Sequence, residues 1–229
     1  MKKKIIIPII FALTMQNLFG ADIQFTEKEA GVYITPEINR TFYSCWNFSA
    51  DGGVKINERY GVKGGLAMGT AGTTFEIKAF AGGEAAIPVK VPLFVSLAYN
   101  YNGLPDYESH THSILPSVSL NWPLAGISAG PGFRFTSFFS EVLFEPVISA
   151  SLYVNFINTD NLRLGFRIAT FDNFTMYNFG GYFLNLNSKI RLSKLVFLIN
   201  EIELHQSGSV GLVSNFYRCV YRGGVTLSW

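Results

Sequence analysis

Residues 142–156 read VLFEPVISASLYVNF, and every even-numbered residue in this stretch is apolar. The odd-numbered residues are mixed and include the carboxylate Glu145, together with Ser149, Ser151 and Asn155. A strict period of two predicts a β-strand with one apolar face. Strands of soluble sandwiches carry the same alternation, so the number of similar segments in the chain decides what kind of sheet this is.

Ten further segments repeat the pattern. They are residues 31–48, 54–69, 73–87, 93–102, 114–122, 127–138, 162–171, 180–192, 195–205 and 217–229. Alternating segments of about ten residues joined by turns are typical of a membrane-spanning barrel, which in bacteria has an even number of strands. The count of eleven becomes ten if one Gly-rich segment between residues 54 and 89 does not span, or twelve if a hairpin is hidden near residues 36–39. We expect a closed antiparallel up-and-down transmembrane β-barrel of about ten strands (range eight to twelve), since the mature chain is short for twelve.

The first twenty residues have the layout of a cleaved secretory signal peptide. Lys2, Lys3 and Lys4 precede the apolar run 5–13, and we place cleavage before Ala21. Removal of three lysines lowers Lys+Arg from 18 to 15 against 16 acids, so the mature net charge is −1. This balance suggests no nucleic-acid partner. Residues 21–229 are predicted to form one outer-membrane barrel domain, because no later segment is an apolar helix and aromatic residues make up 15% of the chain.

The alternation also sorts the charged side chains. Arg40 and Glu58 are the charged residues that fall on the nominal lipid face, where a charge costs a few kcal/mol. Eleven basic residues fall on the inner face: Lys55, Arg59, Lys63, Lys78, Arg134, Arg163, Arg167, Lys189, Arg191, Arg218 and Arg222. Six acidic residues share that face: Glu37, Glu76, Glu84, Glu145, Glu201 and Glu203. Their surplus of five positive charges leads to the functional alternatives for the interior.

Two interiors fit these charges. Paired charges would fill a narrow lumen and give a structural or surface-interaction barrel. A slightly wider lumen would be a porin-like channel with a positive bias, passing small anionic solutes. The surplus of positive charge favours the channel, because a plug of fully paired charges would need no surplus of either sign. A carrier for a small hydrophobic molecule is a further alternative, and no cofactor is expected.

Turn lengths orient the barrel. Short connections near residues 123–126, 158–161 and 193–194 alternate with longer ones near 103–112, 172–179 and 206–215. Short turns face the periplasm in this class, and aromatic residues gather at both membrane interfaces. The predicted periplasmic girdle is Trp122, Phe156 and Trp229, and the predicted outer girdle is Tyr99, Tyr101, Tyr182 and Tyr217.

Cys45 and Cys219 are the two cysteines of an exported chain, so one disulfide is an open question. The first and last strands of a closed barrel are neighbours, which favours an approach. Cys45 falls on the polar face of its segment and Cys219 on the apolar face, which argues against a bridge without a β-bulge.

The chain resembles the bacterial outer-membrane β-barrel class, of which a spirochaete-type member is one possibility. The Lys-rich leader, the alternating segments and the aromatic C-terminus GVTLSW carry this resemblance. The C-terminus is similar to the signal read by the barrel assembly machinery, although that signal usually ends in Phe and here ends in Trp229. The resemblance implies outer-membrane lipid and the assembly machinery as partners.

Two short motifs raise other chemistry. His205 and Ser207 resemble the His-x-Ser element of outer-membrane lipid A deacylases, but the acidic partner of those enzymes has no clear counterpart, so a non-enzyme is preferred. His110 and His112 lie on one face of an extended segment and could share a metal ion, although two ligands without a third are a weak site. We expect neither a catalytic residue nor a metal site.

Overall fold

The computed structural model describes residues 29–39, 44–56, 59–71, 74–170, 182–207 and 215–228. In 29–46 and 215–218, and at residues 71 and 207, only the backbone is described. The strands are β1 (Glu29–Asn39), β2 (Ser44–Ile56), β3 (Tyr60–Ala71), β4 (Thr74–Ala86), β5 (Leu93–Leu104), β6 (Ser109–Asn121), β7 (Ala125–Phe138), β8 (Glu141–Asn158), β9 (Leu162–Thr170), β10 (Tyr182–Arg191), β11 (Val196–Ser207) and β12 (Asn215–Ser228).

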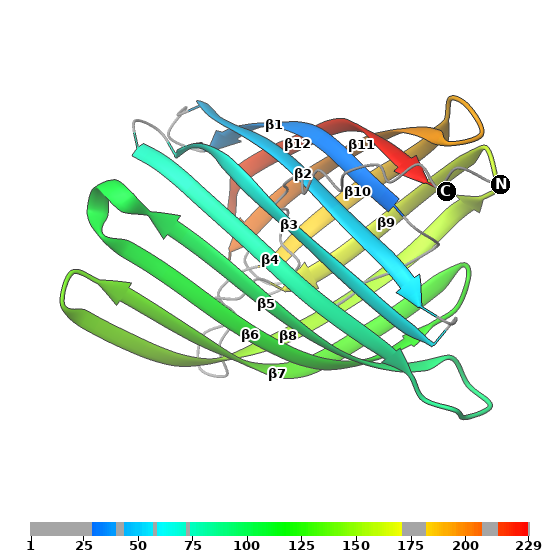
Figure 1. The fold of residues 1–229 in the computed structure, drawn as a ribbon, viewed down its shortest axis with the longest axis horizontal. Coiled ribbons are helices and arrows are strands. Elements are labelled where there is room, and N and C mark those ends of the chain that lie inside the picture. Colours follow the sequence, from blue (N-terminus) through cyan, green and yellow to red (C-terminus); the bar gives the residue numbers. More distant parts are fainter. Residues whose placement is uncertain are drawn as a thin grey trace, which may run out of the picture.

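These strands form one closed barrel. Each strand pairs in antiparallel fashion with its neighbours in sequence, and β1 pairs with β12 to complete the ring. Figure 1 shows the strands tilted across the barrel, with the last strand lying beside the first. No helix in the described part of the chain is both long and apolar enough to cross a membrane.

The closed antiparallel barrel expected from the alternation is confirmed, and its twelve described strands lie at the upper end of the expected range. The preference for ten is wrong, because the chain reverses within the segment 31–48, between β1 and β2. The expected turn at residues 51–53 is also wrong. These residues belong to β2 and pair with Gly65, Gly64 and Lys63 of β3.

Side chains alternate between the outside and the inside of the barrel. In β8, Val142 and Phe144 are 73% and 51% exposed on the outer face, whereas Val147 and Ser149 are 2% exposed on the inner face. Other strands behave alike, as Leu97 on β5 and Ile127 on β7 show. The outer surface is therefore apolar, which suits a lipid solvent and not water.

The connections between strands fall into two sets, one at each end of the barrel. One end, here called the short-turn end, carries the connections 57–59, 87–92, 122–124, 159–161 and 192–195 together with the strand termini Glu29 and Ser228. The opposite end, called the loop end, carries the single-turn 3-10 helix η1 (Pro105–Tyr107) and the connection at 139–140.

Large inner side chains sit against glycine on the facing strand. A Cβ atom at Gly65 would lie 2.6 Å from a ring carbon of Phe80, its partner in the β3–β4 register. A Cβ at Gly126 would likewise meet the ring of Tyr153, whose hydroxyl donates to the Trp122 carbonyl oxygen at 2.9 Å. These glycines let aromatic rings lie flat on the inner wall.

Candidate functional site

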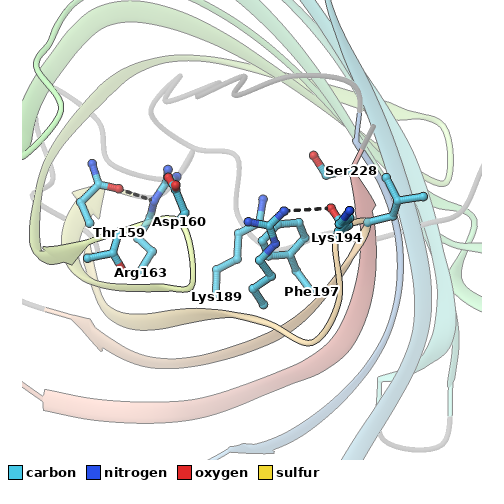
Figure 2. Close-up of a pocket in the computed structure, with 10 residues that line it drawn as sticks. Thr159, Asp160, Arg163, Lys189, Lys194, Phe197 and Ser228 are labelled. Carbon is cyan, nitrogen blue, oxygen red and sulfur yellow. Dashed lines mark hydrogen bonds between the residues drawn. The ribbon is translucent and has the colours of Figure 1, made fainter.

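A cavity of about 560 Å³ opens inside the barrel at the short-turn end. We call it the vestibule, and Figure 2 shows the residues around it, which come from β8 to β12 and from the β8–β9 and β10–β11 turns. It is lined by Asn158, Thr159, Asp160, Arg163, Lys189, Arg191, Lys194, Leu195, Phe197 and Ser228. Four of these side chains are basic and one is acidic, so the lining is strongly positive.

The strand register brings the basic side chains together. Lys189 of β10 pairs with Arg163 of β9, and Arg191 of β10 pairs with Phe197 of β11. The Lys189 ammonium lies 4.7 Å from the centre of the Phe197 ring, and the Arg191 guanidinium lies 5.8 Å from it. The ring face attracts both cations, which holds them near one another on the inner wall.

Two of these cations use neutral acceptors. Arg163 donates from Nε to Asn158 Oδ1 at 3.0 Å. Arg191 donates to the carbonyl oxygens of Ser193 and Lys194 at 3.1 and 3.3 Å. Among the described residues, neither guanidinium lies within ion-pair distance of a carboxylate. Their hydrogen bonds fix the position of the positive charge without neutralising it.

The charges farther along the barrel are paired instead. Arg222 donates to Asp51 at 3.0 Å and to Glu201 at 3.1 Å. Lys78 lies 2.8 Å from Glu76, and Arg134 donates from Nε to Glu145 at 2.8 Å. His205 Nε2 lies 2.9 Å from Glu203 Oε2. The described interior thus changes from paired charges to a positive vestibule towards the short-turn end.

An apolar cluster lies inside the barrel. Leu115, Val147 and Phe183 are 0%, 2% and 1% exposed, and they pack with Ala98 and Ala169. Their neighbours on β5 to β8 are small and polar, with Ser96 bonded to Ser117 and Ser128 bonded to Ser151. We call this cluster the constriction, because its large side chains are buried on the inner wall of the barrel.

The structure places most of the predicted lumen charges on the inner face. Lys63, Lys78, Arg134, Arg163, Arg167, Lys189, Arg191, Arg222, Glu76, Glu84, Glu145, Glu201 and Glu203 lie there, and Lys55 lies there at the exposed end of β2. Arg59 differs, since it is exposed in the β2–β3 turn. Arg40 and Glu58, and the side chains of Glu37 and Arg218, lie outside the described residues.

Asp51 is an inner-face carboxylate that the expected turn at residues 51–53 leaves out. It was assigned to a turn, whereas it is 5% exposed on the inner face of β2. Asn47, Ser49 and Asp51 are odd-numbered residues of β2 and are buried on the same face. Continuing the alternation through the two glycines therefore places Asp51 on the inner face. Among strand residues whose side chains are described, Asp51 and Glu141, the latter at the exposed start of β8, bring the inner face to nine basic and seven acidic residues.

The aromatic girdle residues have different outcomes. Trp122 and Phe156 are 46% and 64% exposed at the short-turn end. Tyr99 and Tyr101 face outward near the loop end, with Tyr99 39% exposed. Tyr182 differs from the prediction, because it is 7% exposed and its hydroxyl bonds Gln206 at 3.1 Å. The side chains of Tyr217 and Trp229 lie outside the described residues.

The disulfide that the sequence leaves open does not form, since Cys219 is a free thiol. Cys45 lies on β2 opposite Glu37, and Cys219 lies on β12 opposite Ile38. Strand β1 separates them, so their Cα atoms are about 10 Å apart by strand spacing. A disulfide requires less than about 7 Å. The hidden hairpin is the reason, because it moves Cys45 from the first strand to the second.

The other candidate motifs are also placed. His205 faces the inside of the barrel and is 1% exposed, which turns it away from the outer surface where lipid chains lie. The side chain of Ser207 is not described. His110 and His112 face outward, opposite Gly103 and Tyr101. Among the described residues no three metal-ligating side chains gather at one point.

Comparison with models of protein families and with curated proteins gives no match. Solved structures do match. NanC porin has a TM-score of 0.56 and 8% identity over 86% of this chain and 100% of its own. The translocator domain of the autotransporter NalP from Neisseria meningitidis has a TM-score of 0.55 and 13% identity, over 91% of this chain and 90% of its own. KdgM porin, solved in complex with disordered oligogalacturonate, has a TM-score of 0.53 and 7% identity, over 87% of this chain and 99% of its own. The chain therefore has the fold of bacterial outer-membrane β-barrels.

Proposed function

We propose that this chain is an integral outer-membrane barrel that acts as a narrow, porin-like channel for small anionic solutes. The vestibule carries the proposal. It gathers Arg163, Lys189, Arg191 and Lys194 around one cavity with Asp160 as the one acidic lining residue. A low-dielectric wall that carries charge of one sign focuses its field into the opening and raises the local concentration of ions of opposite sign.

The size of the barrel supports a narrow path. Barrel diameter grows with strand number, and eight strands leave an interior that side chains fill, whereas sixteen to eighteen leave an open aqueous channel. Twelve strands fall between these cases. The constriction of Leu115, Val147 and Phe183 would then be the narrowest point, because apolar side chains there exclude water.

Fold neighbours add support of a weaker kind. Two of the similar structures are porins, and one of them, KdgM, was solved with oligogalacturonate, an acidic saccharide. At identities of 7% and 8% this ligand is a property of KdgM. Acidic saccharides and smaller carboxylates are nevertheless the solute class that we would test first, since guanidinium groups bind carboxylates well.

A filled structural barrel is the second candidate. The buried ion pairs of Arg222 with Asp51 and Glu201, and the fully buried Leu115, favour it. The two candidates differ in conductance. The mature chain, refolded and inserted into a planar bilayer, is expected to give discrete single-channel steps. If bilayers shown to contain the folded protein carry no current steps at any salt concentration or voltage, the channel is contradicted and the filled barrel remains.

A further inference from the structure

Two tyrosines and two histidines form a cluster on the outer face of the barrel near the loop end. Tyr99 and Tyr101 lie near the C-terminal end of β5, and His110 and His112 lie at the start of β6. All four share the outward face with the exposed residues Leu97 and Ile114. We call them the Tyr–His cluster.

Each imidazole is tied to a phenol through the same nitrogen. Tyr99 Oη lies 2.8 Å from His112 Nδ1, and Tyr101 Oη lies 2.8 Å from His110 Nδ1. When the phenol donates to a neutral imidazole, the ring proton sits on Nε2. When the imidazole is protonated, Nδ1 donates to the phenol oxygen and Nε2 still carries its proton. In these two forms Nε2 is left as a hydrogen-bond donor, whereas the neutral tautomer with its proton on Nδ1 donates to the phenol and leaves Nε2 as an acceptor.

The backbone makes room for this arrangement. Gly103 is the residue opposite His110 in the β5–β6 register, and a Cβ atom there would meet the hydroxyl and ring of Tyr101. The absence of a side chain at Gly103 lets Tyr101 lie across to His110. Its ring is also 5.2 Å from the ring of His112, so Tyr101 contacts both histidines.

The surroundings of the cluster are apolar towards the middle of the barrel. On β7 and β8, the rings of Phe135 and Phe144 are 5.1 Å apart, and those of Phe133 and Phe144 are 6.0 Å apart. Phe135 is the residue opposite His112. In lipid, a polar group without a partner costs several kcal/mol, so these imidazole donors require acceptors at the level of the headgroups.

We propose that the Tyr–His cluster binds the phosphate of an anionic lipid headgroup, through Nε2 of His110 and His112. The inference rests on the membrane location of the proposed function. Two imidazoles on residues i and i+2 of one strand face the same way. Aromatic side chains at this level are typical of the membrane interface.

An anionic headgroup at the cluster would meet no negative side chain on the facing strands. The groups that face the two imidazoles carry no charge. They are Tyr99 and Tyr101 from β5, and Phe135 and Ser137 from β7. Near the adjoining loop, Asp106 accepts a hydrogen bond from the Phe75 amide and Glu108 is exposed.

The chain contains three histidines, which makes the test specific. The imidazole ¹⁵N signals of the refolded mature protein in maltoside micelles would be followed while phosphatidylglycerol is added. The Nε2 signals of His110 and His112 should move and that of the interior His205 should not.

Phosphatidylcholine and inorganic phosphate are the comparison ligands, and each should move the signals less than phosphatidylglycerol does. Gly103→Val should weaken lipid binding by displacing Tyr101, whereas Tyr221→Phe, which alters another outward tyrosine, should not. Equal shifts with inorganic phosphate, or no shift at His110 and His112, would overturn the proposal. Heat-modifiable migration and vesicle insertion, scored separately, show whether the membrane barrel itself has failed.

Discussion

Arg222 Nη2 lies 3.0 Å from Asp51 Oδ2, so that a buried ion pair joins the last strand to the second strand across β1. The same guanidinium reaches Glu201 on β11 at 3.1 Å, and Lys63 on β3 lies 3.7 Å from Asp51. One arginine therefore connects residues on both sides of the seam at which the barrel closes. Closure depends on these inner charges as well as on the backbone ladder.

Replacing Arg222 with Gln should destabilise the barrel strongly. Removal of Arg222 leaves the buried carboxylate of Asp51 and the half-buried carboxylate of Glu201 without this cation, and breaking a buried pair costs about 3–5 kcal/mol. Equilibrium unfolding by urea in lipid vesicles measures the change. Lys55→Gln is the matched control, because Lys55 is exposed at the barrel end and its loss should change stability by less than about 1 kcal/mol. Equal stability of the two variants would show that the pair is not buried in the folded barrel.

Deletion of residues 224–229 should abolish assembly. Strand β12 pairs with β11 on one side and with β1 on the other, and this deletion removes the pairing of Gly224 and Val225 with Tyr33 and Val32. Without it two sheet edges stay open to other chains. The full mature chain should migrate faster in unheated than in heated gel samples, and the truncated chain should not. A heat-modifiable truncated protein would contradict the closure described here.

Leu115→Ala tests the constriction. A smaller side chain at a position with 0% exposure should widen the narrowest part and raise single-channel conductance. It should also lower stability by about 2–5 kcal/mol, the usual range for a buried Leu→Ala change. Leu97→Ala on the outer face is the control and should leave conductance unchanged. An unchanged conductance in folded Leu115→Ala channels would place the narrowest point elsewhere.

The faces of the strands could be predicted from the sequence, but their number could not. The alternation of residues 142–156 continues unbroken along β8, whereas the chain reverses at residues 40–43, which read RTFY. These four residues include no Gly, Pro, Asn or Asp, and the last register pair, Ile38 with Ser44, joins two even-numbered residues, so the period of two continues from β1 into β2. Conversely, residues 51–53 read DGG and yet pair within a sheet, because tertiary pairing overrides local preference.

The vestibule could be predicted in part. Alternation put Arg163, Arg167, Lys189 and Arg191 on one wall of neighbouring strands, and the structure places three of them around the cavity. Arg167 lies farther in, with its guanidinium 5.7 Å from the Phe183 ring centre. Which carboxylate meets which cation depends on register and barrel closure. The contact between Arg222 and Asp51, 171 residues apart, therefore had no sequence signal.

Reversal potential in a salt gradient tests the central claim most directly. With different KCl concentrations on the two sides of the bilayer, wild-type channels should show a reversal potential whose sign indicates that chloride permeates better than potassium. Arg163→Gln combined with Arg191→Gln should shift it towards potassium with little loss of stability, because both guanidinium groups bond neutral acceptors. A cation-selective wild type, or a double variant with the wild-type potential, would contradict a channel governed by the positive vestibule.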